Sequence, residues 1–148
     1  MHLPTTGHLQ AVKRVLRYLA GTMTHGIFLS RNNTWSLHGF SDADWGGNTE
    51  DYVSTNAFIV YLGNQPVSWS SRKQNTVARS SIEAEYRSVA NTSSEICWIH
   101  SLLDELGVPI NSGPVIYCDN VGATYLCANL VFHSRMKHVA LDYHFIRQ

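Results

Sequence analysis

The first part of the chain carries apolar side chains at the spacing of a helix. Between residues 8 and 20 they recur every three or four positions, at Leu9, Val12, Val15, Leu16 and Leu19. This period places them on one helix face, and Gly21 is a suitable residue to end the segment. The pattern therefore predicts an amphipathic helix over residues 8–20.

The middle of the chain shows the pattern of short strands. Residues 27–29 are a short apolar run, residues 35–42 alternate between apolar and polar, and residues 57–62 are mostly apolar. Turn-forming residues at 63–66 separate the last of these runs from residues 67–69. We therefore expect antiparallel hairpins in this region.

The helical period returns at Ser80, which forms a capping-box pattern with Glu83. The stripe expected to be buried comprises Ile82, Tyr86, Val89, Ser93 and Ile96. Glu85 flanks this stripe, whereas Glu83 is expected to point to solvent. The segment extends to about residue 106, as one long helix or as a helix with a kink, before a glycine and a proline end it.

The last predicted elements are a buried strand over residues 114–118 and a short helix over residues 121–128. The whole order is helix, hairpins, long helix, strand, helix. This order predicts an α/β fold with a mixed β-sheet, antiparallel hairpins and helices packed on its faces.

The composition fits one domain with a packed core, since 44% of the 148 residues are hydrophobic and 15% are charged. The three cysteines form no Cys-x-x-Cys pair, so we expect reduced thiols in an intracellular protein. No apolar run approaches the length of a membrane span, and no membrane partner is expected. The formal net charge is zero, which argues against a globally basic nucleic-acid binder.

Three acids stand where a purely structural role does not require them. Asp42 ends the alternating strand, Asp119 follows the predicted buried strand, and Glu85 flanks the helix stripe. Ligand sites of α/β sheets gather at the carboxyl ends of strands. Converging carboxylates repel one another unless a cation compensates them, and oxygen ligands suit Mg²⁺ or Mn²⁺. Two such ions would support hydrolysis of a phosphodiester.

Structural interpretations of the same acids stay open. Asp42 with Asp44 is also typical of a solvated loop, and Glu85 of a solvated helix position. The pair Asp119-Asn120 is also typical of a helix N-cap. The pattern alone indicates a metal site without excluding these roles.

Six motifs, in order, resemble the ribonuclease H domain of copia-type retrotransposon polyproteins. They are Ala11-Val12-Lys13-Arg14-Val15-Leu16-Arg17-Tyr18-Leu19, Ser41-Asp42-Ala43-Asp44-Trp45, Val67-Ser68-Trp69-Ser70-Ser71-Arg72-Lys73-Gln74, Ser81-Ile82-Glu83-Ala84-Glu85-Tyr86, Tyr117-Cys118-Asp119-Asn120 and Lys137-His138-Val139-Ala140-Leu141-Asp142-Tyr143-His144-Phe145-Ile146-Arg147. The resemblance implies a ribonuclease H-like domain over residues 25–148, truncated at its C-terminus. Residues 1–24 would be the last helix of the preceding reverse transcriptase.

The resemblance further implies an endonuclease that cleaves the RNA strand of RNA–DNA hybrids with two Mg²⁺ ions, for which Mn²⁺ substitutes. The implied metal ligands are Asp42, Glu85, Asp119 and Asp142, and His138 is implied as a further catalytic group. Some relatives carry the fourth acid at the position of Ala140, and His138 is also typical of a surface histidine. The implied partners are the hybrid and the reverse transcriptase portion of the polyprotein, in cytoplasmic virus-like particles or in the nucleus.

Cations beside an aromatic strand would hold the phosphates and the 2′-hydroxyls of a hybrid. The residues expected to contact nucleic acid are Ser70, Ser71, Arg72, Lys73, Gln74 and Asn120. A solvated hairpin end is the structural alternative. Two other functions stay open: a catalytically silent domain that packs against reverse transcriptase or holds the hybrid, and an integrase- or transposase-type nuclease.

Overall fold

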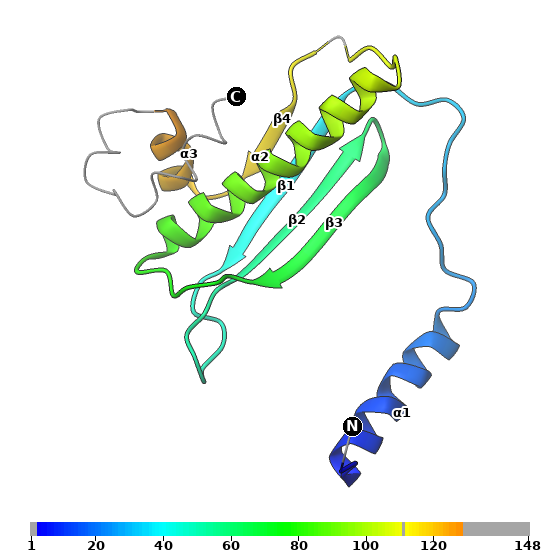
Figure 1. The fold of residues 1–148 in the computed structure, drawn as a ribbon, viewed down its shortest axis with the longest axis vertical. Helices are drawn as coiled ribbons and strands as arrows, with labels where there is room; N and C mark the ends of the chain where they lie inside the picture. Colours follow the sequence, from blue (N-terminus) through cyan, green and yellow to red (C-terminus); the bar gives the residue numbers. More distant parts are fainter. Residues whose placement is uncertain (1–2, 111, 129–148) are drawn as a thin grey trace.

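The computed structural model describes residues 3–110 and 112–128 (Figure 1). Its elements are, in chain order, α1 (Thr6–Gly21), β1 (Leu37–Asp44), β2 (Thr55–Leu62), β3 (Gln65–Lys73), α2 (Ser81–Glu105), β4 (Val115–Cys118) and α3 (Val121–Ala128).

The four strands form one mixed sheet in the order β3-β2-β1-β4. The pairs β1–β2 and β2–β3 are antiparallel, whereas β1 and β4 are parallel, with Ser41 opposite Cys118. Parallel β1 and β4 bring their carboxyl ends to the same edge of the sheet. The predicted α/β class with a mixed sheet is confirmed, and the arrangement is compatible with a ribonuclease H-like fold.

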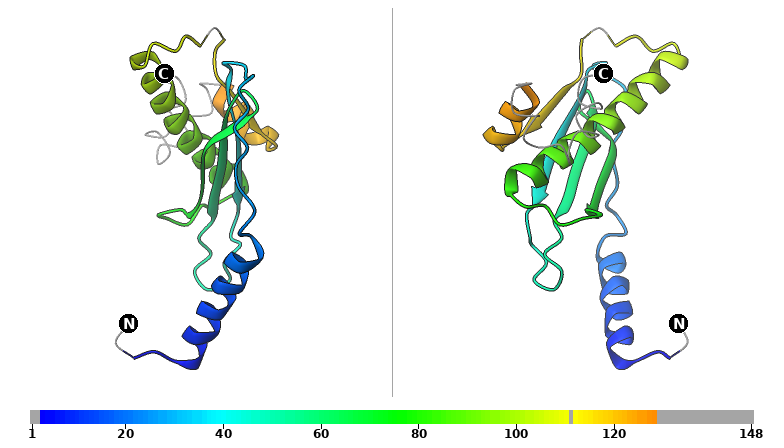
Figure 2. Two further views of the ribbon diagram at one scale, coloured as in Figure 1. Left: turned by 90° about the vertical axis from the view of Figure 1, so that its right-hand side faces the viewer. Right: turned by 60° about the vertical axis from the view of Figure 1, so that its left-hand side comes forward.

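Helix α2 lies across one face of the sheet (Figures 1 and 2). The main buried cluster consists of Leu37, Val60, Ile96, Ile99 and Leu103. The helix approaches β1 closely at Gly39, where an added Cβ would meet the Ile96 Cδ1 atom at 3.0 Å. Close packing at this point fixes the position of α2 against the centre of β1.

The opposite face of the sheet is open over its centre. Tyr117 stacks on Phe40, and His38 stacks on Tyr61, so that four rings from three strands form a continuous exposed or half-buried layer. The expectation that residues 114–118 form a buried strand is wrong for this reason. Only one face of β4 is covered, and Tyr117 is 52% exposed.

The sequence predicts α1 well but overestimates strand formation before β1. Thr5 caps the helix and forms a reciprocal capping box with His8. No residue of α1 is buried, and the helix lies away from the sheet (Figure 1). The strand expected at residues 27–29 is absent from the described structure, because no neighbouring strand pairs with this exposed segment.

Helix α2 is one continuous helix, capped by the Ser80 side chain and followed by Gly107 at φ +70°. Two details of its predicted stripe are wrong. Ile82 is exposed, and Glu83, expected in solvent, is buried. The loop before α2 covers this first turn, because the Glu83 carboxylate accepts a hydrogen bond from the Arg79 backbone N–H.

Candidate functional site

Glu85 is a buried carboxylate at the carboxyl-terminal edge of the parallel strand pair. It comes from the second turn of α2 and is 6% exposed. Burial raises the pKa of its carboxyl above the ordinary value, and a hydrogen bond from the Ala43 backbone N–H opposes this rise. The negative charges of Asp42 and Asp119 raise the pKa further. Neighbours of like charge therefore surround a desolvated acid.

Asp119 and Cys118 lie beside Glu85 at the end of β4. Their Oδ and Sγ atoms and one carboxylate oxygen of Glu85 all lie within 4.8 Å of one another. The Cys118 thiol lies 3.9 Å from Glu85 Oε2. Burial raises the pKa of this thiol, an effect that a backbone hydrogen bond from Asn120 opposes and the charges of Glu85 and Asp119 increase. The three groups form a compact cluster that we call the acidic cluster.

Asp42 lies near the acidic cluster but is not one of its three members. The carboxylate acts on Glu85 through its charge, and the side chain is exposed on β1. Ser88 of α2 holds the backbone of Asp42 in place, because its hydroxyl donates a hydrogen bond to the Asp42 carbonyl at 2.7 Å. Ser41 in turn donates to the Ser88 hydroxyl at 3.0 Å. These two hydrogen bonds connect β1 to α2 and fix the distance between them next to Glu85.

The acidic cluster has no cationic partner among the described residues. The ion pairs among the described residues are Lys73–Asp51, Arg87–Glu83 and His100–Asp104. None of them includes Asp42, Glu85 or Asp119. A buried carboxylate is ordinarily paired or coordinates a metal, so the donor set fits a divalent cation.

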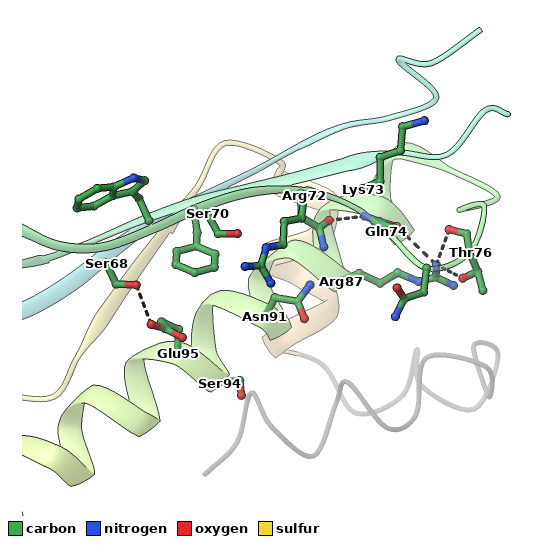
Figure 3. Close-up of a pocket in the computed structure, with 14 residues that line it drawn as sticks. Ser68, Ser70, Arg72, Lys73, Gln74, Thr76, Arg87, Asn91, Ser94 and Glu95 are labelled. Atoms are coloured by element: carbon green, nitrogen blue, oxygen red, sulfur yellow. Dashed lines mark hydrogen bonds between the residues drawn. The ribbon is translucent and has the colours of Figure 1, made fainter. Parts of the chain in front are cut away.

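A polar groove of about 750 Å³ lies between β3 and the flank of α2 (Figure 3). Arg72 and Asn91 point toward one another across it. At one end Arg87 donates to the Thr76 side chain, and at the other Ser68 donates to Glu95. Arg72 forms no ion pair within the described residues, so its guanidinium is available to an anion in the groove.

The residues predicted to contact nucleic acid divide into two groups. Ser70, Arg72, Lys73 and Gln74 line the groove, whereas Ser71 does not. Gln74 is buried, and its amide donates to the Ala84 carbonyl, so its side chain is engaged within the protein.

Asn120 has a structural partner outside the groove. Its Oδ1 atom accepts a hydrogen bond from the Ala123 backbone N–H, which is the arrangement of an N-cap on α3. The N-cap alternative for this position is therefore realised.

Two functional candidates were missed by sequence reasoning. Arg87 lines the groove and is held by Glu83 and Thr76, but its helical position carries no signal that distinguishes it in the sequence. The sequence analysis expects Cys118 only as a reduced thiol, although its position directly before Asp119 at a strand end is a signal. The predicted Asp142 and His138 lie outside the described residues.

Together the fold and the site define an α/β domain with a separate cationic groove and an acidic cluster at a strand edge that has no cationic partner among residues 3–110 and 112–128. Over 147 residues, or 99% of the chain, it is 74% identical to the retrovirus-related Pol polyprotein from transposon RE2 of Arabidopsis thaliana. The polyprotein from transposon RE1 of the same plant is 73% identical over 147 residues. That from transposon TNT 1-94 of Nicotiana tabacum is 35% identical over 145 residues.

These matches show homology to copia-type retrovirus-related Pol polyproteins over nearly the whole chain, and they support a retroelement origin. The chain spans about a tenth of the length of these curated relatives. No protein-family model and no solved structure matches it. No helix within the described ranges is both long and apolar enough to cross a membrane.

Proposed function

We propose that this chain is the ribonuclease H-type portion of a copia-type Pol polyprotein and cleaves the RNA strand of RNA–DNA hybrids. The observation that carries the proposal is that the buried Glu85 carboxylate lies close to the Asp119 carboxylate at a strand edge. Neither carboxylate forms an ion pair with a cationic side chain among the described residues. The similarity to Pol polyproteins supports the same proposal, because it covers almost the full length of this chain.

Asp42, Glu85 and Asp119 would hold two Mg²⁺ ions, or Mn²⁺ in their place, with Asp142 as a fourth ligand. Bound ions would supply activation of water and stabilisation of the leaving oxygen. The protein contributes placement: parallel β1 and β4 bring Asp42 and Asp119 to one edge, and Ser88 holds the backbone at Asp42. His138 would act beside these acids.

The groove is proposed to bind the phosphates of one strand. Arg72 offers a cation on β3 that is unpaired among the described residues, and Lys73, which is paired with Asp51, lies next to it in the chain. Asn91 and Ser94 offer polar side chains on α2. Phosphates are the sequence-independent part of nucleic-acid recognition, which suits an enzyme acting on any hybrid. Residues 1–24 would belong to the end of the reverse transcriptase, for which the unburied apolar face of α1 offers a contact surface.

A second candidate is a catalytically silent domain that holds the hybrid. The observation in its favour is that Asp42 does not belong to the group of ligand atoms within 4.8 Å. The same cationic groove would serve this function without any bound ion.

A cleavage assay separates the two candidates. The full chain would be incubated with Mg²⁺ and labelled RNA–DNA hybrid, double-stranded RNA or double-stranded DNA. We expect cleavage of the RNA strand of the hybrid alone, abolished by a chelator and by Asp119→Asn. Asp104→Asn, which removes an exposed acid of α2, is the matched control and should retain activity. Hybrid binding without cleavage would overturn the nuclease proposal and support the silent domain.

A further inference from the structure

The acidic cluster contains a sulfur atom that a purely oxygen-based magnesium site does not require. Its three donor atoms come from three different parts of the fold: Glu85 from α2, Cys118 from the last position of β4, and Asp119 from the following loop. The parallel register with β1 places Cys118 opposite Ser41, on the face that α2 covers. The thiol is therefore held against Glu85 by the sheet itself.

The spacing of these atoms is close to that of ligands that share one ion. Zinc binds sulfur at about 2.3 Å and carboxylate oxygen at about 2.0–2.2 Å, so tetrahedral ligands lie roughly 3.5 Å apart. The observed atoms lie within 4.8 Å of one another. Rotation of the exposed Asp119 side chain about its own bonds would close most of the difference.

The chemistry of the donors selects the class of cation. Mg²⁺ is a hard ion that prefers oxygen, whereas thiolates favour softer ions such as Zn²⁺. We infer that Glu85, Cys118 and Asp119 form a mixed sulfur–oxygen site for one thiophilic divalent cation. When the metal–sulfur bond forms, the thiol proton passes to solvent, and water fills the remaining coordination position.

A second observation supports a cation at this place. Glu85 is more than nine-tenths buried, yet it forms no ion pair with any described residue, whereas the other buried glutamate of α2 is paired with Arg87. The nearby carboxylate of Asp42 adds negative charge without adding a partner. Asp119 is exposed and Cys118 is half-buried, so an ion has a route to the cluster from solvent.

The inference shares two carboxylates with the proposed nuclease but does not rest on hydrolysis. An ion bound to Cys118 would use Glu85 and Asp119, which are also proposed ligands of Mg²⁺, and it would therefore compete with Mg²⁺ for the site. The test therefore uses a binding signal that is independent of cleavage. A chain that never cleaves a hybrid would still bind the thiophilic ion.

Cadmium is a suitable probe because its bond to a thiolate gives an ultraviolet charge-transfer band. Cd²⁺ would be titrated into the reduced, metal-free full chain. We expect a band that saturates at one equivalent and is lost in Cys118→Ser. Cys97→Ser is the matched control, since Cys97 is also half-buried but lies on α2 outside the acidic cluster, and this variant should keep the band.

A second variant keeps the test decisive if Cys118→Ser does not fold. Asp119→Asn retains the thiol but replaces a charged carboxylate ligand with a neutral amide, and it should weaken Cd²⁺ binding at least about tenfold. Circular dichroism would establish the folded state of each variant. A band that persists in Cys118→Ser, or an affinity unchanged in Asp119→Asn, would overturn the inference and show an adventitious ion on other thiols or histidines.

Discussion

Glu83 and Glu85 lie two residues apart on α2, and both are buried, with exposed fractions of 3% and 6%. They can both be buried because the first turns of α2 have protein on two sides. Glu83 accepts hydrogen bonds from the Arg79 backbone N–H in the loop before the helix and from the Arg87 guanidinium one turn further along α2. Glu85 faces the ends of β1 and β4, where Asp42 and Asp119 add like charge.

The difference between the two glutamates separates an acid that is paired within the protein from one that we propose as a metal ligand. The Glu83 carboxylate lies 2.6 Å from an Arg87 nitrogen and so has its countercharge within the protein. Glu85 has none among the described residues, and its pKa is raised by burial and by neighbouring acids. Carboxyl groups with raised pKa values concentrate at functional sites, because a structure built for stability alone pairs its buried charges.

The largest expected contrast is in activity. Glu85→Gln should lower metal-dependent cleavage of a hybrid at least about a hundredfold, because a metal ligand supplies several kcal/mol of charge stabilisation. The same variant should be equally or more stable than the parent chain in metal-free buffer, since repulsion falls. Single-turnover cleavage and thermal unfolding measure the two effects. Activity within a few-fold of the parent would show that Glu85 is not a ligand.

Glu83 should show the reverse behaviour. Glu83→Gln leaves Arg87 without its countercharge, so the free energy of unfolding should fall by about 2–4 kcal/mol. Urea unfolding measures this loss, and Asp51→Asn, which breaks the exposed pair with Lys73, is the control with a much smaller expected loss. Equal losses in the two variants would contradict the structural role of Glu83.

The sequence indicated the acid positions better than it indicated which acid is paired. Asp42, Glu85 and Asp119 were singled out from strand ends and helix period, and the described structure brings Glu85 and Asp119 together. Periodicity placed Glu83 in solvent because it describes one helix and one core face. It contains no information on the loop that returns over the first turn of α2.

The same limit explains β4 and Cys118. An apolar stretch of five residues predicts a strand, but burial depends on whether helices cover both faces of the sheet. Tyr117 is exposed because the face opposite α2 is open over β4. Contact between Cys118 and Glu85 likewise depends on the register of β4 against β1, which no local pattern specifies.

A smaller effect is expected at Ser88, which links the Glu85 side of α2 to β1. Ser88→Ala removes a buried hydroxyl that bonds Ser41 and the Asp42 carbonyl, and it should cost about 1–3 kcal/mol of stability. Ser101→Ala removes an exposed hydroxyl bonded to its own helix and should change stability by less than about 0.5 kcal/mol. Chemical denaturation of both variants makes the comparison. If the free energy of unfolding falls no more in Ser88→Ala than in Ser101→Ala, the Ser88 hydroxyl does not stabilise the contact between α2 and β1.

The smallest expected effect is the response to acid. The raised pKa of Glu85 lets the folded state bind a proton at pH values where the unfolded carboxyl, with an ordinary value of 4.5, has lost it. As the pH falls through the folded pKa to below 4.5, stability from this group should rise. The pKa of Asp51 is lowered from 3.8, chiefly by its hydrogen bond with Lys73, so its contribution should be lost as the pH falls below 3.8.

Unfolding of metal-free parent and Glu85→Gln chains across this range measures the response. The stability of the parent relative to the variant should increase toward lower pH. A difference that stays constant would show that the pKa of Glu85 is not raised.

The central claim is that divalent cations bind at Glu85 and not at Glu83. Titration of Mn²⁺ into the isotopically labelled chain tests this directly, because the ion broadens the amide signals of nearby residues. We predict early and selective broadening at residues 42–43, 85 and 118–119, with signals of the Glu83–Arg87 pair affected later. Early broadening centred on Glu83, or on the exposed acids Asp51 and Asp104 alone, would contradict the account.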